Sequence, residues 1–241
     1  MSVKRAEDVL DLLEYLAARG RPTGVPEIAQ DLGWPRSSAY RIINTLEQRG
    51  YLYETKARGG YYPSPRWIAL ADQFTAGFAL PEFAQDLTRT SMERSGETVS
   101  IVAPAGPWAV FVLVSESAAP IRYFAKAGHR IPIHASASGR ALLQQYDKTE
   151  LRALLSRITF ETYGATTPTD VDAVLTAIEQ GKERRYQLNV EEFTPDLLGI
   201  AVPLPIEGRR FALVVSGPTY RMQAKVEELA ELLLEQVVAW Q

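Results

Sequence analysis

Cysteine is absent from the 241-residue sequence, and histidine occurs only twice. Without thiols the chain can form neither disulfides nor thiolate metal sites, a composition that fits a cytoplasmic protein. The chain has only two histidines, His129 and His134, both in one predicted loop. A three-histidine metal site is therefore excluded. We therefore expect neither a metal ion nor a cofactor.

The sequence also has no segment suited to a membrane. Its most apolar run, residues 101–114, is interrupted by Pro104, Gly106 and Pro107. These interruptions predict two strands joined by a turn rather than a membrane-spanning helix. Charged residues throughout 4–14 leave no apolar core for a secretory signal. We expect a soluble, cytoplasmic protein.

Sequence signatures of catalysis are missing as well. The chain has no Gly-x-Ser-x-Gly elbow, no phosphate-binding loop and no dinucleotide-binding fingerprint. The neighbouring Glu191 and Glu192 would point to opposite sides of a strand or loop. We expect them at a solvated rim rather than in a site built from paired carboxylates, and we do not expect an enzyme.

Charge is distributed unevenly along the chain. The net charge of −3 argues against a protein that binds DNA by bulk charge alone. Between residues 36 and 66, however, six basic residues are set against two acidic ones. A positive segment on an acidic protein supplies the local attraction that contact with DNA phosphates requires. Recognition of DNA would therefore be local.

The apolar spacing around this positive segment predicts two short helices. Apolar residues repeat at helical spacing over 25–32 and again over 39–46. Gly33 ends the first helix, and Pro35 lies at or near the first position of the second. The opposite face of the second helix carries donors and acceptors of the kind that reach base edges and phosphates. The candidate DNA-binding residues on this helix are Arg36, Ser37, Ser38, Tyr40, Arg41 and Asn44.

A short hairpin is expected directly after the second helix. Its strands are residues 51–54 and 61–62, and Lys56 and Arg58 give its turn a basic tip. Helix, turn, helix and basic hairpin together predict a winged helix-turn-helix domain that reads DNA. Lys56 and Arg58 would contact the DNA backbone or minor groove. A helix-turn-helix pattern by itself often reflects packing, so a purely structural role is the alternative.

The first predicted helix, residues 3–18, has more apolar surface than a short partner can cover. Its main stripe is widened by Val3, Ala6, Leu10 and Ala17. Surplus apolar surface of this kind indicates either a contact with a second subunit or additional packing in the core. The sequence leaves both explanations open.

The rest of the chain predicts a second domain. A linker helix from Ser64-Pro65 to about Gly77 divides the chain into a DNA-binding domain with its linker, residues 1–78, and a domain of residues 79–241. In the second domain the predicted helices are 81–96, 140–146, 148–156, 167–181 and 222–240, and the predicted strands are 98–103, 109–115, 121–125, 186–190, 198–204 and 211–216. Residues 128–134 are expected to form a loop. This pattern predicts an α+β fold on a mostly antiparallel sheet.

Two features of the second domain suggest a ligand pocket. Small residues over 135–139 lead into a helix, where free backbone N–H groups would hold a carboxylate or a similar anion. An ordinary capped helix start is the simpler explanation of that feature. Gly199 leaves a gap beside one strand, and Ser216 supplies a hydroxyl near the end of another. Together they could line one pocket between sheet and helix, although a bulge and a helix cap would explain them separately.

The combination of motifs resembles the IclR family of bacterial transcriptional regulators over nearly the whole chain. The segments that carry the resemblance are 28–41, with Gly33-Trp34-Pro35-Arg36-Ser37-Ser38, then 46–51, 96–98, 134–143 and 216–218. The resemblance implies a winged-helix DNA-binding domain, a linker helix and a GAF-like effector-binding domain. It also implies homodimers through the N-terminal domain, often paired into homotetramers, and small organic or aromatic acids as effectors.

By position, the resemblance puts an effector pocket on five residues: Ala137, Ser138, Asn189, Gly199 and Ser216. The chain departs from the family pattern at two places. Residues 195–198 lack the glycine that is common before the pocket strand, and Gly199 stands where some members have cysteine. These departures suggest a roomier and more apolar pocket.

Our hypothesis from the sequence is a transcription factor that binds a double-stranded DNA operator as a dimer or tetramer under the control of a small-molecule effector. The alternative is a metabolite-binding enzyme whose N-terminal domain serves only for dimerisation. The two hypotheses differ in whether the polar face of the second helix is used for DNA.

Overall fold

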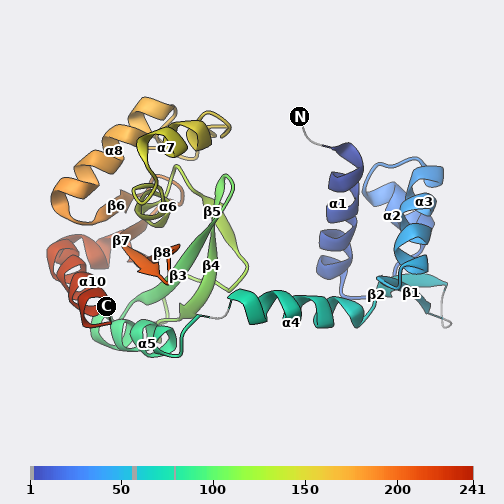
Figure 1. Ribbon diagram of the computed structural model, residues 1–241, viewed down its shortest axis with the longest axis horizontal. Coiled ribbons are helices and arrows are strands. Elements are labelled where there is room, and N and C mark those ends of the chain that lie inside the picture. The colour runs from blue at the N-terminus through green and yellow to red at the C-terminus, as the bar shows by residue number, and fades with distance from the viewer. Residues whose placement is uncertain (1–2, 56–58, 79, 241) are drawn as a thin grey trace. The chain divides into compact units, whose positions relative to one another are not determined.

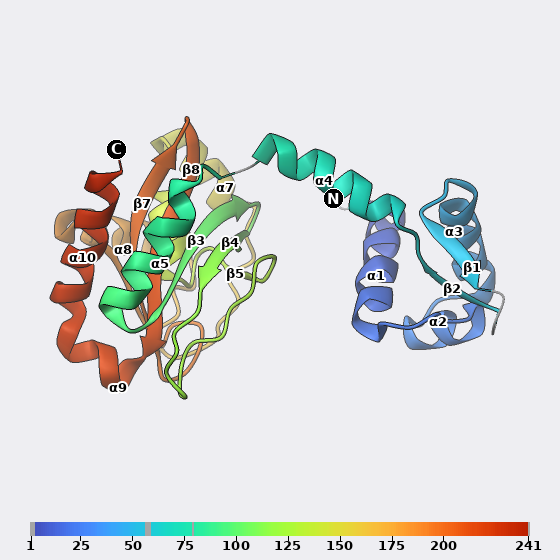
Figure 2. The same ribbon diagram turned by 90° about the horizontal axis from the view of Figure 1, so that it is seen from below.

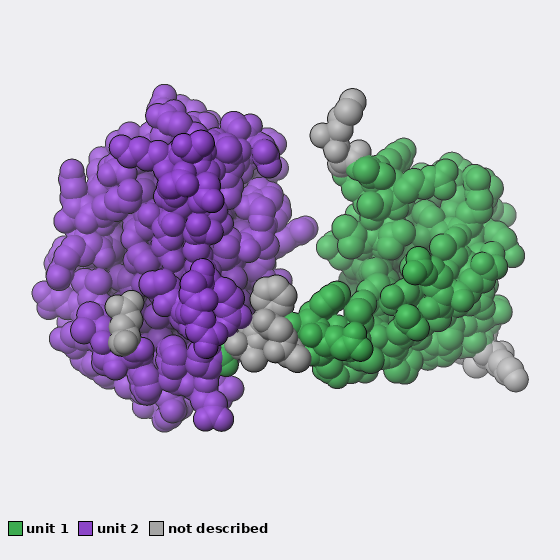
Figure 3. Space-filling model, in the orientation of Figure 1, with its two compact units in different colours: residues 1–80 green, residues 81–241 purple. Residues whose placement is uncertain are grey.

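The computed structural model describes residues 3–55, 59–78 and 80–240. The chain separates into two compact units, Met1–Leu80 and Pro81–Gln241 (Figure 3). The sequence predicted a division after residue 78. Each unit has its own hydrophobic core and its own sheet. In the part of the chain described, no helix is long and apolar enough to cross a membrane.

The first unit is a three-helix core with a hairpin and a following helix (Figure 1). Its elements are α1 (Lys4–Arg19), α2 (Val25–Asp31), α3 (Arg36–Gln48), β1 (Leu52–Thr55), β2 (Gly60–Pro63) and α4 (Arg66–Phe78). Gly33, with φ +66°, makes the tight turn between α2 and α3. Pro35 precedes α3, where its fixed φ fits the start of a helix. The core comes from the predicted apolar faces: Leu12, Leu16, Ile28, Ile42, Ile43, Leu46 and Leu52.

The hairpin is joined to α4 by aromatic and polar contacts within this unit. The Ser64 hydroxyl accepts a hydrogen bond from the Arg66 N–H (3.3 Å) at the start of α4, where the sequence predicted the linker helix to begin. The Trp67 indole N–H donates to the Tyr51 carbonyl (2.9 Å), and the two rings lie 4.7 Å apart. Helix, turn, helix and antiparallel hairpin are therefore present as predicted. The predicted basic tip, with Lys56 and Arg58, lies outside the described residues.

The second unit contains a six-stranded antiparallel sheet in the order β5-β4-β3-β8-β7-β6. The strands are β3 (Thr98–Ala105), β4 (Trp108–Ser115), β5 (Arg130–Pro132), β6 (Gln187–Val190), β7 (Leu197–Ile206) and β8 (Arg209–Pro218). The helical elements are α5 (Phe83–Ser95), α6 (Ala137–Leu143), α7 (Lys148–Leu155), α8 (Val171–Arg184), α9 (Thr219–Met222), the 3-10 turn η1 (Gln223–Lys225) and α10 (Val226–Ala239). The predicted α+β class with a mostly antiparallel sheet is confirmed.

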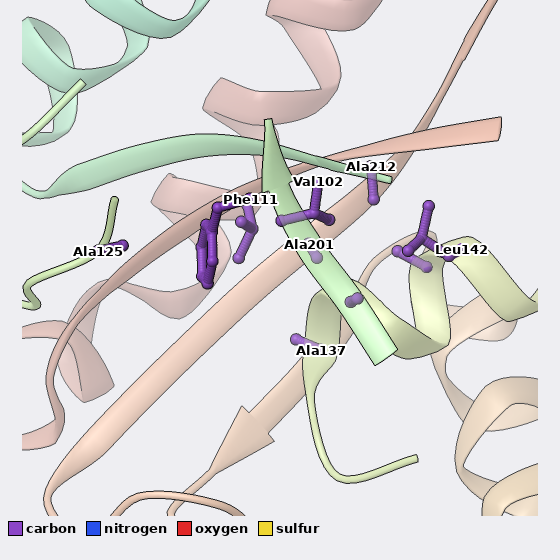
Figure 4. Close-up of a cluster of buried hydrophobic side chains, with 10 residues drawn as sticks. Val102, Phe111, Ala125, Ala137, Leu142, Ala201 and Ala212 are labelled. Carbon is purple, nitrogen blue, oxygen red and sulfur yellow. The ribbon is translucent and has the colours of Figure 1, made fainter. Parts of the chain in front are cut away.

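Helices cover both faces of this sheet. As a result, β7 and β8 are buried at most positions. Helix α6 packs across β7 and β8, and its Ala137 and Leu142 join Ala201 and Ala212 in one apolar cluster (Figure 4). Helices α5 and α10 pack against each other and against strands of the same sheet (Figure 2). Successive side chains along β7 and β8 point to opposite faces of the sheet, so alternate residues contact different helices.

The predicted strand 121–125 is wrong, and so is the predicted loop over 128–134. The edge strand is β5, within that predicted loop, and it pairs with β4. Pro132 is tolerated there because an edge strand needs no inward N–H at that position. The segment 121–125 is held by side chains instead of a ladder: the Thr98 hydroxyl donates to the Tyr123 carbonyl (2.8 Å), and Arg221 donates to the Ile121 carbonyl (2.9 Å).

Several predicted helix boundaries also need correction, among them the start of the helix predicted over 167–181, which begins at Val171. Helix α6 begins at Ala137 rather than Arg140, because the Ser136 hydroxyl caps it by accepting from the Gly139 N–H (3.1 Å). Helix α8 does not stop at Gly181 but continues to Arg184. A side chain at position 181 would overlap the amide of Gln187. The glycine is therefore needed for close packing and not for ending the helix.

Candidate functional site

The polar face of α3 is the first candidate site. Among its predicted DNA-binding residues, Arg36, Ser37, Tyr40 and Arg41 are exposed, whereas Ser38 and Asn44 are partly buried. Tyr40 is 56 % exposed, a large value for an aromatic side chain. On the opposite face Ile42 and Ile43 are buried in the core. The face predicted for DNA contact is thus turned away from the core of its own unit.

The arginines on this face have no acidic partner among the described residues. Neither Arg36 nor Arg41 takes part in an ion pair with any residue that the structure describes. Arg41 makes only a 3.3 Å hydrogen bond from Nε to the Ser37 carbonyl, one turn earlier. Arg19 and Arg21, by contrast, are paired with acidic residues of α2. Unpaired guanidinium groups on an exposed helix face are available for phosphates or base edges.

The acidic residues of α2, the helix before α3, are paired within the unit. Asp31 accepts hydrogen bonds from the Tyr15 hydroxyl (2.8 Å) and from Arg19. These bonds, the one from Tyr15 first, lower the pKa of the Asp31 carboxyl. Glu27 is paired with Arg19 and Arg21. The negative charge of α2 is therefore largely screened from the cations of α3.

The apolar surplus predicted on α1 is exposed within this unit. Val3, Ala6, Leu10 and Ala17 are all exposed, with Val3 at 69 % and Leu10 at 60 %. Their spacing follows the seven-residue pattern of helices that pair with another helix. Core packing, the other explanation of this surplus, does not account for it, because these side chains are not in the core of the unit.

The second candidate site is a cavity in the second unit that brings together all five residues predicted for the pocket. Ala137 and Ser138 lie in the first turn of α6, Asn189 on β6, Gly199 on β7 and Ser216 on β8. The other residues that line the cavity are Phe111, Tyr123, Ile131, Ser136, Phe193, Leu197 and Val214.

Sheet register explains why three of these residues meet. Asn189 is directly opposite Gly199, and Gly199 is directly opposite Ser216. Residues in one row across an antiparallel sheet point to the same face, here the face covered by α6. A Cβ at Gly199 would lie 3.7 Å from both Ala137 Cβ and Ser216 Oγ. The missing side chain of Gly199 therefore leaves space at the floor of the cavity.

Several hydrogen-bonding groups of the cavity lack a protein partner among the described residues. They are the hydroxyls of Tyr123, Ser138 and Ser216 and the backbone N–H groups of Ala137 and Ser138. The hydroxyl of Ser136, by contrast, is used in the helix cap, and the Asn189 amide donates to the Ala135 carbonyl (2.8 Å). Burial raises the pKa of Tyr123, so its hydroxyl remains a donor. The cavity offers uncharged donors and no free cation.

The cavity is narrow. Its volume is about 30 Å³, enough for a water molecule but far below the roughly 300 Å³ at which sites for organic ligands begin. The roomier pocket suggested by the sequence departures is not present in this packing. Phe111, Tyr123 and Phe193 are the bulkiest of the lining side chains, and their rings take up room that a ligand would need. Sequence reasoning missed Tyr123 and Phe193, which lie on irregular segments without a periodic signal.

A buried ion pair lies beside the cavity. Arg140 of α6 is 1 % exposed, and its guanidinium binds both carboxylate oxygens of Glu192, one of them at 2.9 Å. The same guanidinium also donates to the Leu188 carbonyl. The prediction that Glu192 belongs to a solvated rim is therefore wrong, because its side chain turns inward to Arg140. The exposed Glu191 fits that prediction.

His134 is buried close to the start of α6. Its Nε2 lies 3.2 Å from the Glu161 carbonyl, and Nδ1 has no partner among the described residues. Burial lowers the pKa of His134, so the neutral ring is favoured. The rings of Phe160 and Tyr163 lie at 5.3 and 6.0 Å. Across the described residues, no group of three or more acidic or histidine side chains is placed to hold a metal ion.

Both units match families of known domains. Residues 6–56 match the IclR helix-turn-helix domain, and residues 76–239 match the C-terminal domain of the bacterial transcriptional regulator IclR. The HTH-type transcriptional regulator BhcR of Paracoccus denitrificans is 30 % identical over 236 residues, which cover 97 % of this chain and 84 % of that protein.

Solved structures share the whole fold. The IclR of Thermotoga maritima superimposes with a TM-score of 0.72 at 22 % identity, covering 97 % of this chain and 95 % of that one. An IclR homologue of Microbacterium hydrocarbonoxydans, solved in complex with 4-hydroxybenzoate, has a TM-score of 0.75 at 23 % identity and covers 97 % and 96 % of the two chains. At these identities the structural likeness establishes the fold alone.

Proposed function

Because the chain belongs to the IclR family of bacterial transcriptional regulators, we propose that it controls transcription in response to a small organic or aromatic acid. Its relative from Paracoccus denitrificans is named as a transcriptional regulator. Membership of this family makes the chain a DNA-binding regulator and not an enzyme, so the alternative of a metabolite-processing enzyme is set aside. Such a regulator would work in the cytoplasm, where the operator is.

Helix α3 is the proposed reading element. Its exposed face with the unpaired Arg36 and Arg41 is the observation that carries this part of the proposal. In the helix-turn-helix geometry the second helix enters the major groove, where an arginine reaches a guanine edge or a phosphate. Ser37, Tyr40 and Asn44 would add contacts to bases and backbone. The remaining predicted contacts are Ser38 on α3, and Lys56 and Arg58 on the wing.

A dimer is the proposed DNA-binding form. The exposed apolar stripe of α1, including Val3 and Leu10, supports a contact between two copies of the N-terminal unit. A twofold dimer would read an operator made of two inverted half-sites. Pairing of two dimers into a tetramer is compatible with this arrangement.

The cavity of the second unit is the proposed effector site. Its free hydroxyls on Ser138 and Ser216 and its free N–H groups suit a carboxylate, and Phe111 and Tyr123 suit the flat face of a ring. The Microbacterium homologue in complex with 4-hydroxybenzoate supports an aromatic acid as one candidate. An effector that binds one dimer arrangement better than another would shift the population that fits the operator.

Two measurements test this function. Fluorescence anisotropy with the DNA upstream of the gene should give saturable binding that competitor DNA of random sequence does not abolish. A thermal-shift screen of small carboxylic acids, 4-hydroxybenzoate included, should raise the melting temperature for a few of them, because binding to the folded state increases stability. Binding of random and upstream DNA with equal affinity would contradict the role of α3 as a sequence reader.

A further inference from the structure

An organic ligand can occupy the cavity only if one of its walls moves, because the present volume is about 30 Å³. Most of the walls are fixed. Phe111, Gly199 and Ser216 belong to strands bonded on both sides within the sheet. The floor at Ser138 is fixed as well, since the next residue, Gly139, packs directly on the Ile133 carbonyl.

Two walls are irregular segments, and their central residues are held differently: Tyr123 by a hydrogen bond to its backbone carbonyl, and Phe193 by a ring contact with Tyr163 (4.9 Å). Tyr123 is held through its own carbonyl by the Thr98 hydroxyl, and its neighbours are held at the Ile121 carbonyl and at the buried Ala125. The second segment, residues 191–196, carries Phe193 and is called the roof loop here. Residues 193–195 make no hydrogen bond with any residue that the structure describes.

The ends of the roof loop are well placed to act as hinges. The Glu191 N–H donates to the Leu197 carbonyl (2.9 Å), so the loop leaves and rejoins the sheet at one point. Glu191 and Asp196 both have left-handed backbone conformations, with φ of 60° and 58°. Non-glycine residues are strained in that region, and strain at both ends lowers the cost of a second loop conformation.

The roof loop is attached to the floor of the cavity by one ion pair and by a hydrogen bond from the Glu192 N–H to the Asn189 side-chain oxygen (3.4 Å). Glu192 binds Arg140 through both carboxylate oxygens, and Arg140 lies two residues after Ser138 on α6. The side chain of Glu192 is 14 % exposed, whereas that of Arg140 is 1 % exposed. Water therefore reaches the loop side of the pair first. A hydrogen bond from the Thr167 hydroxyl to the Glu192 carbonyl adds a neutral contact to the outer side of the loop.

We propose that Arg140 and Glu192 are positioning residues that hold the roof loop closed over the cavity, and that a ligand enters when this pair opens and Phe193, which lines the cavity, moves out of it. This inference rests on the proposed function, in which the cavity is the effector site. It adds the route of entry and the residues that control it. Arg140 remains bonded to the Leu188 carbonyl in the open form, so its charge keeps one partner.

A thiol placed at the floor of the cavity measures opening without any effector. The natural chain has no cysteine, so Ser138→Cys gives a single reactive site that iodoacetamide reaches only when the cavity opens. Alkylation of the full-length protein is followed by intact mass spectrometry. Its rate reports the open population when closing is fast. In the Ser138→Cys background, Glu192→Gln should accelerate alkylation about tenfold, the effect of losing one charged hydrogen bond.

Matched variants separate local opening from general unfolding. Glu191→Gln changes the neighbouring carboxylate, which is exposed, and should leave the rate unchanged. Ser100→Cys puts the thiol on β3, which is bonded on both sides, and its alkylation should not respond to Glu192→Gln. Glu192→Asp keeps the charge but shortens the side chain, so it should give an intermediate rate. If Glu192→Gln fails to fold, the alkylation rate of Glu192→Asp still shows whether the ion pair controls access to the cavity.

Two outcomes would overturn the proposal. Equal alkylation of Ser138→Cys with and without Glu192→Gln would mean that the pair does not control access. Equal acceleration at Ser138→Cys and Ser100→Cys would mean that the pair only supports the unit as a whole. The assay needs no effector, so a failure to find any organic acid that binds would count against the proposed function and not against the closure by Arg140 and Glu192.

Discussion

The two candidate sites are built in opposite ways. The α3 face is exposed, and Arg36 and Arg41 have no acidic partner among the described residues. The cavity is small, and the guanidinium of Arg140, beside its floor, is buried and bound to both carboxylate oxygens of Glu192. A surface that binds a large polyanion can be preformed, because water solvates its charges until the polyanion binds. A site for a small acid must be kept apart from water and requires a moving wall.

This difference predicts where substitutions cause most damage. On α3 a truncated side chain should remove a contact and leave the fold intact. Around the cavity, small residues are needed for close packing, so additional atoms should affect stability before they affect binding. Gly139 and Gly199 provide a direct comparison, because they line the same region with different amounts of free space.

Gly139→Ala should have the largest effect on stability. A Cβ at this position would overlap the backbone carbonyl of Ile133, which cannot move without shifting α6. We expect a loss of about 3 kcal/mol in the free energy of unfolding, the upper end for overpacking. Urea unfolding monitored by circular dichroism measures it. The matched variant Gly199→Ala, whose Cβ would find neighbours at 3.7 Å, should cost less than about 1 kcal/mol. Equal losses would show that the packing around Gly139 is looser than described.

Arg41→Ala should weaken binding to the operator by about 2 kcal/mol if the guanidinium contacts a base. If it contacts a phosphate instead, the dependence of affinity on salt should become shallower by about one unit of slope. Anisotropy titrations at several salt concentrations distinguish these cases. Arg21→Ala is the matched control, because Arg21 is already paired with Glu27. Affinity and slope that are unchanged in Arg41→Ala would remove this residue from the interface.

Ser138→Ala should weaken binding of the effector found in the acid screen by about 1.5 kcal/mol, the value of a hydrogen bond to a charged group. The change removes a hydroxyl that has no protein partner, so the free energy of unfolding should hardly change. Isothermal calorimetry measures the loss, and operator affinity without effector serves as the control. Unaltered effector affinity together with a normal fold would place the carboxylate elsewhere in the cavity.

Much of this comparison was accessible from the sequence, for physical reasons that differ between the sites. The α3 face follows from helical periodicity, since the buried Ile42 and Ile43 fix the direction of Arg41. The row of Asn189, Gly199 and Ser216 could not be derived from periodicity, because it depends on the register between strands. Gly199 and Ser216 were suggested by a missing side chain and a hydroxyl near strand ends, whereas Asn189 was placed by resemblance to the IclR family.

Two of the aromatic residues that line the cavity, and the ion pair beside it, were not predicted from the sequence. Phe193 and Tyr123 lie on segments without regular structure, where sequence spacing does not determine direction. The pair of Arg140 and Glu192 joins residues that are 52 positions apart in the sequence. Tertiary packing determines which carboxylate Arg140 binds, and sequence spacing does not show it. The strand predicted at 121–125 failed for a similar reason, since side chains of Thr98 and Arg221 take the carbonyls that a ladder would use.

Acid should destabilise the second unit through His134, with a smaller effect than the substitutions above. Burial lowers the pKa of this ring in the folded chain, whereas in the unfolded chain it titrates near its ordinary value of about 6.5. As the pH falls through about 6.5, the unfolded state takes up a proton before the folded state does, so the free energy of unfolding decreases. The stabilisation is complete above this pH and is fully lost once the pH is below the lowered pKa of the folded state.

His134→Gln should remove this part of the pH dependence. The glutamine amide can still donate to the Glu161 carbonyl, which lies 3.2 Å from Nε2, and it does not titrate. Urea midpoints measured between about pH 7 and 5, the range in which an unfolded histidine gains its proton, should therefore fall less in this variant than in the wild type. His129→Gln, the same substitution at an exposed position nearby, is the matched control. Parallel slopes in His134→Gln and wild type would mean that other groups dominate, which would leave the buried ring as a packing element between Phe160 and Tyr163.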